Sequence, residues 1–188
     1  MSADDRAAAA NVLGAVALAV AGQIPVAVTP AGGRSDSAAA ALSALYHVLD
    51  RPTVDQLCRV LGLTHSGGVR LVDRLAAAGL VERGPGADRR SRSVRLTAAG
   101  RRAARRVSER RLGYLTSLLA GFSPAETRAL HGLLGRVMGR VVQHKHGGAW
   151  ICRMCDLQAC GRAAGNCPAA NAAAIKYGTA PPGEPRHG

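Results

Sequence analysis

The fold is decided by residues 53–100, which read TVDQLCRVLGLTHSGGVRLVDRLAAAGLVERGPGADRRSRSVRLTAAG. The stretch opens with Thr53 and has Gln56 three residues later, which is the spacing of a capping box at a helix start. Gly62 can take the left-handed conformation that ends a helix, and Thr64 can cap a second helix over residues 65–78. Two short helices joined by a short, glycine-bearing turn are typical of a helix-turn-helix.

The second helix has the composition of a DNA-recognition helix. Its apolar residues fall at helical spacing, whereas small or polar residues stand at its start and arginines follow. Small residues allow the N-terminal end of a helix to approach base edges in a major groove. The residues expected to face DNA on this helix are Thr64, His65, Ser66, Gly67, Gly68, Arg70 and Arg74.

A basic hairpin is predicted directly after this helix. Residues 80–83 and 92–96 alternate as half-buried strands do, and glycine, proline and charged residues fill the turn between them. We expect Arg89, Arg90 and Arg92 to reach the minor groove or its phosphates. Two helices followed by a cationic hairpin indicate a winged helix-turn-helix. The alternative, a helix pair that only packs, leaves the hairpin unexplained.

These segments resemble the MarR family of bacterial transcriptional regulators. The resemblance rests on LGLTHSGGVRLVDRLAAAGLVER at 61–83, on ADRRSRSVRLTAAGRR at 87–102 and on the flanking helices, and it covers about residues 5–146. It implies a mainly α fold with a small β-wing and with N- and C-terminal dimerisation helices. It also implies a cytoplasmic homodimer that binds a pseudo-palindromic DNA duplex as a repressor rather than an activator, with a small molecule as a possible effector.

The distribution of charge supports a nucleic-acid partner. The 188-residue chain has a formal charge of +13 and an isoelectric point near 11.1. Residues 51–111 hold 15 Arg and 5 Asp or Glu, a net +10. A solvated charged face would give the same count, but in combination with the hairpin this patch favours duplex DNA. With one Trp, one Phe and three Tyr, stacking on single-stranded bases is disfavoured.

The N-terminal segment needs a separate interpretation because residues 7–28 carry no charge. Their length would suit a membrane span, and Ala-Val-Ala at 19–21 resembles a signal-peptidase site. However, the preceding residues are net acidic, and the run is mostly alanine, which is a strong helix former. We therefore expect a soluble helix from Asp4 to about Gln23, and keep a membrane-associated or secreted basic protein as an alternative.

Five segments are expected along the chain. They are an N-terminal dimerisation helix and loop (1–34), the winged helix-turn-helix domain (35–100), C-terminal dimerisation helices (101–147), a cysteine-rich segment (148–177) and a disordered tail (178–188). Within them, we expect helices over 37–51, from 98 to about 120 and from 124 to about 146. The last contains Gly132, Gly135 and Gly139, which suggest close approach of another helix, such as the N-terminal one of the same or the partner subunit.

Four of the five cysteines fall within sixteen residues. Cys152, Cys155, Cys160 and Cys167 have the spacing C-x2-C-x4-C-x6-C. Four thiolates suit one soft metal centre, and a short chain segment brings them together at little entropic cost. Two disulfides are the competing interpretation, but a DNA-binding protein works in a reducing compartment. The sequence therefore predicts a metal centre.

The identity of the metal stays open between zinc and an iron–sulfur cluster. Structural zinc sites usually have two C-x2-C pairs, whereas this segment has one. A proline after the last cysteine is also found in iron–sulfur ligation, although the spacing is different.

An iron–sulfur enzyme that processes DNA is therefore an alternative function, but no carboxylate or lysine has a recognisable catalytic setting, and we predict that the protein is not an enzyme. Cys58 is interpreted as a small buried hydrophobic residue and not as a sensor.

Overall fold

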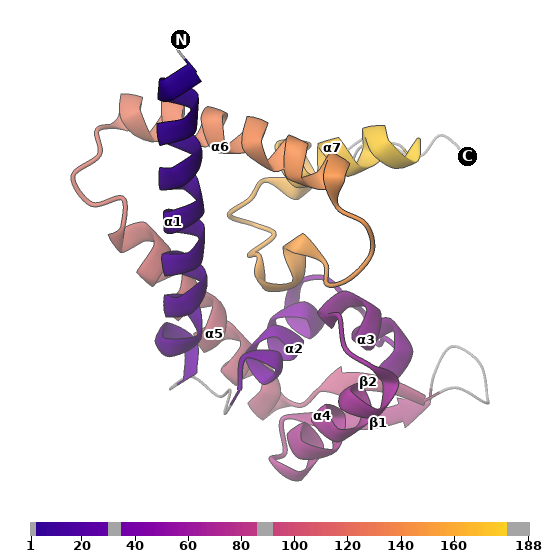
Figure 1. Ribbon diagram of the computed structural model, residues 1–188. Helices are drawn as coiled ribbons and strands as arrows, with labels where there is room; N and C mark the ends of the chain where they lie inside the picture. Colours follow the sequence, from indigo (N-terminus) through magenta and orange to yellow (C-terminus); the bar gives the residue numbers. More distant parts are fainter. Residues whose placement is uncertain (1–2, 30–34, 86–91, 180–188) are drawn as a thin grey trace.

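The computed structural model describes residues 3–29, 35–85 and 92–179 and shows a mainly helical chain with one small sheet (Figure 1). The elements in chain order are α1 (Ala3–Val28), α2 (Asp36–His47), α3 (Val54–Leu61), α4 (His65–Ala77), β1 (Val81–Pro85), β2 (Arg92–Leu96), α5 (Ala98–Ser117), α6 (Pro124–His144), the short 3-10 helices η2 (Ile151–Met154) and η3 (Arg162–Ala164), and α7 (Pro168–Tyr177). The predicted fold class, a mainly α protein with a small β-wing, is confirmed.

Local capping chemistry sets the boundaries of the helix-turn-helix. The side chain of Thr53 accepts a hydrogen bond from the backbone N–H of Gln56, and the side chain of Gln56 accepts one from the backbone of Thr53. Gly62 ends α3 in the left-handed conformation with φ 69°. Thr64 then caps α4 by accepting a hydrogen bond from Gly67 N–H at 3.2 Å. Each of these predictions from the sequence is confirmed.

The two strands form an antiparallel hairpin, the wing. Its register pairs Val81 with Leu96 and Pro85 with Arg92. The backbone N–H of Val94 donates to the carbonyl of Pro52 at 2.8 Å, so the second strand is tied to the residue before the capped start of α3. The hairpin is therefore fixed to the helix pair at its base. The predicted turn over 84–90 lies largely outside the described residues.

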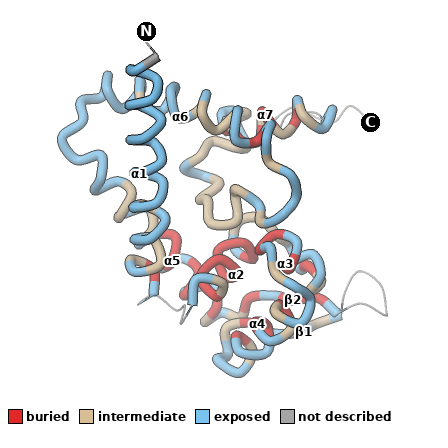
Figure 2. Tube along the Cα trace, viewed as in Figure 1, coloured by how far each residue is buried: buried red, intermediate tan, exposed pale blue. Residues whose placement is uncertain are grey.

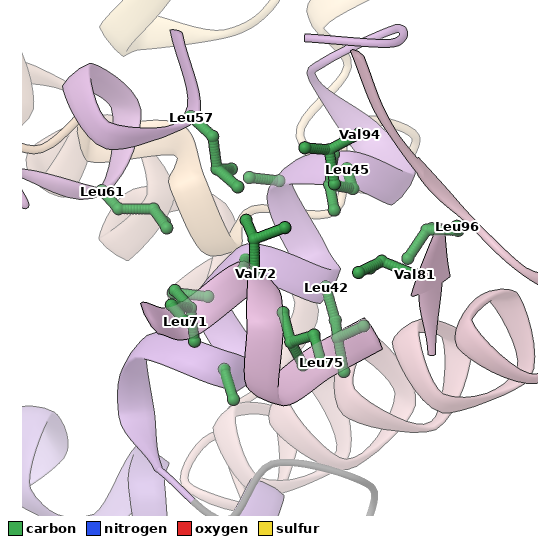
Figure 3. Packing of buried hydrophobic residues seen from close by; sticks show 14 of the residues in the cluster. Leu42, Leu45, Leu57, Leu61, Leu71, Val72, Leu75, Val81, Val94 and Leu96 are labelled. Atoms are coloured by element: carbon green, nitrogen blue, oxygen red, sulfur yellow. The ribbon is translucent and has the colours of Figure 1, made fainter. Parts of the chain in front are cut away.

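The main core lies between α2, α3, α4, the sheet and the start of α5 (Figure 2, Figure 3). Residues 38–45 of α2 are all buried, which makes α2 the central element of this domain. Leu42, Leu57, Leu71 and Val72 are at most 1% exposed and come from α2, α3 and α4. The two helices of the helix-turn-helix therefore rest on a closely packed apolar base.

Two helix boundaries differ from the prediction. α2 ends at His47 and not near Arg51, because the N–H groups of both Val48 and Leu49 donate to the carbonyl of Ala44 and close the helix early. α1 continues past Gln23 and through an internal proline to Val28. Val28 is buried with Ala39 of α2 and Val107 of α5, so tertiary packing holds this last turn in place.

The glycines of α6 have a different neighbour from the one favoured by the sequence. A Cβ at Gly135 would lie 3.2 Å from Pro168 of α7, while one at Gly132 or Gly139 would meet nothing within 4 Å. The close approach in this chain is therefore made by α7, which runs beside α6 (Figure 1). The sequence analysis did not predict α7 as a helix, although Pro168 at its first position and Gly178 at its end are start and stop signals.

Candidate DNA-binding surface and four-cysteine segment

Helix α4 presents its polar face to solvent. Ser66, Arg70 and Arg74 are exposed, whereas Leu71 and Leu75 on the opposite face are buried in the core. The side chains available to a ligand are therefore those that the sequence assigned to DNA. The arrangement gives a short helix with a small-residue start and two projecting guanidinium groups.

Two of the predicted contact residues also organise the start of α4. The hydroxyl of Thr64 accepts the capping hydrogen bond from Gly67, and Nδ1 of His65 lies 2.6 Å from a carboxylate oxygen of Asp55 on α3. Both Thr64 and His65 remain exposed. The contact between His65 and Asp55 therefore joins α4 to α3, while the side chains of Thr64 and His65 stay accessible to a ligand.

Gly68 is corrected from a predicted DNA contact to a packing residue. It is buried and faces α3, where a Cβ in its place would overlap the sulfur of Cys58. The thiol of Cys58 in turn donates to the carbonyl of Thr64 at 3.5 Å. Burial raises the pKa of the Cys58 thiol, with the nearby carboxylate of Asp55 acting in the same direction. Cys58 is thus a packing residue, as the sequence indicated.

Salt bridges that the sequence analysis missed brace the wing. Arg83 of β1 contacts the carboxylate of Asp73 on α4 at 2.7 Å, and Arg95 of β2 contacts Glu82 of β1 at 3.0 Å. Neither salt bridge could be predicted from the sequence, because its two partners come together only through the packing of α4 and the register of the strands. Arg92 is exposed on β2, whereas the predicted contacts Arg89 and Arg90 lie outside the described residues.

The cysteine-rich segment folds as a series of tight turns. The N–H of Cys155 donates to the carbonyl of Cys152 at 3.0 Å, and the N–H of Cys160 donates to the carbonyl of Asp156 at 3.1 Å. Gly161 and Gly165 both have left-handed φ values, 64° and 72°. These turns reverse the chain repeatedly between η2 and α7.

The turns bring the cysteines close to one another. Cys167 is buried in a cluster with Val142 and Ala170, and Cys152 and Cys160 pack against the same cluster. Cys155 follows Cys152 across a tight turn, and the thiol of Cys160 donates to the carbonyl of Leu157 at 3.6 Å. Across residues 3–29, 35–85 and 92–179, however, no three His, Cys, Asp or Glu side chains form a ready metal site.

One thiol of the group is strongly acidified. The hydrogen bond from Cys152, with the nearby guanidinium groups of Arg111, Arg153 and Arg162, lowers the pKa of Cys155 to about 6. The same hydrogen bond and burial raise the pKa of Cys152.

A cavity of about 380 Å³ lies next to this segment, between α6 and α7. Its walls include Ile151 and Tyr177, and its cationic groups include Lys145 and Arg162. The volume is in the lower part of the range of small-molecule sites. An apolar wall with cations nearby suits a small anionic ligand with an apolar body.

Large apolar side chains are exposed along α1 and α6. On α1, Val16 is 52% and Leu18 79% exposed, and on α6, Leu133 and Leu134 are 56% and 50% exposed (Figure 2). Residues 4–28 are long and apolar enough to cross a membrane, and only 6% of their most apolar window is buried within the chain. So large an apolar surface in one protomer needs a partner, either another protein surface or lipid.

Comparison with known proteins identifies the fold. Residues 33–91 match the family model of the MarR family. A MarR family protein from Bacillus stearothermophilus shares 24% identity, with 75% of this chain and 98% of that chain covered and a TM-score of 0.64. MepR, a transcription regulator of the Staphylococcus aureus multidrug efflux pump MepA, shares 16% identity over 70% and 97% of the two chains, with a TM-score of 0.61. A comparison with curated proteins found no match.

Proposed function

We propose that this chain, a winged helix-turn-helix regulator of the MarR family, controls transcription by binding duplex DNA as a homodimer. The observation that carries the proposal is the exposed start of α4 next to the wing. Thr64, Ser66 and Arg70 are exposed on α4, and the salt bridge from Asp73 to Arg83 joins this helix to β1. Membership of a family of regulators also agrees with the prediction that the protein is not an enzyme.

In the proposed complex, α4 enters a major groove and the wing lies over the adjacent backbone. Arg70 and Arg74 project from α4, and Arg92 projects from the wing. Guanidinium groups bind phosphate and the guanine edge in bidentate fashion. The buried core beneath α4 keeps the helix rigid, so these groups are held in position before DNA arrives. Gly68 faces the core and is not part of the proposed contact surface.

The second protomer is proposed to cover the apolar faces of α1 and α6. A homodimer would remove Leu18 and Leu134 from water without a membrane, and it would present two copies of α4 to DNA. Recognition helices in such dimers bind half-sites about 34–36 Å apart, one turn of the duplex. A pseudo-palindromic operator follows from this symmetry. Transcription is then repressed by occupancy of the operator in the cytoplasm.

A small-molecule effector would act by changing the separation of the two recognition helices. The cavity between α6 and α7 is the proposed binding site, because it lies beside the helices that connect the protomers. An effector with one carboxylate could bind near Lys145 and Arg162. Repression would be relieved when the two copies of α4 no longer match successive major grooves.

Arg70→Ala is expected to weaken binding of the selected operator at least tenfold, because loss of a base contact costs about 1–3 kcal/mol. The operator would first be selected from a pool of random duplexes with the full chain. Arg128→Ala on α6 is the matched control, because it removes the same charge from an exposed helix position far from α4 along the chain. DNA affinity is measured by fluorescence anisotropy. If the two variants lose equal affinity, α4 is not part of the DNA interface.

Arg90→Ala tests the wing. If Arg90 neutralises a phosphate, its removal lowers affinity for all duplex sequences and reduces the salt slope by about one per protomer. The slope of the logarithm of the dissociation constant against the logarithm of the salt concentration measures this directly. An unchanged slope with unchanged affinity would contradict a wing contact at this position.

A further inference from the structure

We propose that Cys152, Cys155, Cys160 and Cys167 together bind one thiophilic metal centre, either a zinc ion or an iron–sulfur cluster, that fastens the C-terminal segment between the DNA-binding domain and α6. The binding of metal is independent of the proposed function. Only the effect of the metal centre on DNA binding rests on the proposed function.

The first support is the arrangement of the thiols. Cys152, Cys160 and Cys167 come from different turns, yet they pack in or against one cluster, and the turn that joins Cys155 N–H to the carbonyl of Cys152 keeps Cys155 beside them. Zinc needs each sulfur about 2.3 Å from the ion, so a single ion requires the four sulfurs to close further. A cluster, which is larger than one ion, needs less closure. On binding, each ligand thiol releases its proton to solvent, and its sulfur forms a bond to the metal.

The second support is the fold of the segment around the thiols. Cys167 is buried and lies directly before Pro168, where α7 begins. The side-chain amide of Asn171 on α7 donates to the carbonyl of Gly165 at 2.7 Å and holds the last turn against the helix. At Gly161, the left-handed φ of 64° makes any side chain costly. The sharp turns thus leave Cys152, Cys155 and Cys160 half-buried and Cys167 buried, which a solvent-exposed tail would not require.

The third support is charge. Four thiolates around a dication, or around a cluster core of the same charge, carry a net charge of −2. Arg153 of η2 and Arg162 of η3 lie within the cysteine-rich segment, and Arg162 lines the same cavity as Cys152. The nearest acidic residue in sequence, Asp156, turns its carboxylate to the N–H groups of Gln158 and Ala159. The basic residues of the segment can therefore offset the negative charge of the centre.

The position of the segment links the centre to DNA binding. The N–H of Trp150 donates to the carbonyl of Val60 at 2.8 Å, which joins the segment to α3. Met154 packs against the core of the DNA-binding domain and also against the cluster formed by Val28, Ala39 and Val107. A metal centre between residues 152 and 167 would hold these contacts in place, and its loss would loosen the attachment of α3.

At the other end, the segment is held by α7. The Lys176 ammonium group donates to the carbonyls of Val142, Gln143 and Lys145 at 3.0, 2.9 and 2.8 Å. These three acceptors lie at the C-terminal end of α6, where the helix leaves carbonyls without intrahelical partners. The centre therefore connects two anchored regions, α3 on one side and α6 with α7 on the other.

The test measures metal in the full chain, without DNA. The protein is purified anaerobically without chelator, then incubated with zinc chloride or with ferric iron, sulfide and dithiothreitol, which supplies the electrons that a four-iron cluster needs, and desalted. We expect either about one zinc per chain and no colour, or about two or four iron atoms with matching sulfide and visible absorption. Cys155→Ser should lose this metal and melt about 5–10 °C lower, since bound metal adds to folding free energy.

Cys58→Ala is the matched control, because it removes the one cysteine outside the segment and should retain the full metal content. Circular dichroism of Cys155→Ser verifies that helices remain, so that loss of metal is not mistaken for unfolding. Two disulfides or four freely titrating thiols in wild-type protein after both incubations would overturn the proposal. If metal is absent and operator binding persists, only the metal centre fails. If metal binds and no operator can be selected, the proposed function fails instead.

Discussion

Replacing Gly100 by alanine is expected to lower the free energy of unfolding by about 2–3 kcal/mol, near the upper end for overpacking in a closed site. Gly100 is buried in the first turn of α5, and a Cβ there would overlap the carbonyl of Leu80 at the base of the wing. That carbonyl cannot retreat freely, because it accepts a hydrogen bond from the N–H of Thr97 at 3.1 Å. The added methyl group must therefore separate α5 from the wing.

Gly113→Ala is the matched control for this prediction. It lies in the same helix, and a Cβ there would meet nothing within 4 Å. Alanine at an open helix position should stabilise by about 1 kcal/mol, because glycine loses more backbone entropy on folding. Urea denaturation at one matched protein concentration compares the two variants. If both change stability in the same direction and by a similar amount, close packing at Gly100 is not the cause.

The hydrogen bonds around Thr97 and Gly100 explain why the start of α5 after the wing could be predicted from the sequence. LTAAG at 96–100 combines a capping threonine with a glycine three residues later, and the structure uses both. The hydroxyl of Thr97 accepts a hydrogen bond from Gly100 N–H at 3.0 Å and donates to the carbonyl of Gly79 at 2.7 Å. Local hydrogen bonding of this kind depends on residues a few positions apart, so a linear pattern can predict it. The caps at Thr53 and Thr64 were predicted for the same reason.

Features that depend on distant contacts were not predictable in this way. Gly68 stands among small and polar residues that are typical of DNA contacts, and only the position of Cys58 on α3 shows that Gly68 faces inward. α1 passes through Pro25 because Val28 finds a buried site between α2 and α5. The arrangement of the cysteines likewise depends on turns whose directions cannot be derived from cysteine spacing. The predicted set of four metal ligands stays a prediction.

Substitution of a glutamate for Leu18 or Leu134 is expected to convert the proposed homodimer to a monomer at micromolar concentration. These side chains are 79% and 50% exposed in one protomer, on α1 and α6 respectively. A carboxylate buried without a partner in the interface would weaken association by at least 100-fold, on the order of 3 kcal/mol. Sedimentation velocity of each variant measures the change.

DNA affinity should fall when the dimer is lost. In a dimer, binding of one protomer to its half-site raises the effective concentration of the second protomer at the other half-site, which a monomer lacks. The expected loss on a full operator is about 10²- to 10⁴-fold, while affinity for a single half-site should be unchanged. Ile175→Glu on α7 is the control, since Ile175 is 80% exposed but lies outside α1 and α6. It should stay dimeric and bind the full operator. If the Leu18 and Leu134 variants both sediment as dimers, these faces are not the interface. Loss of half-site affinity would instead mean that the charge had disturbed α4 itself.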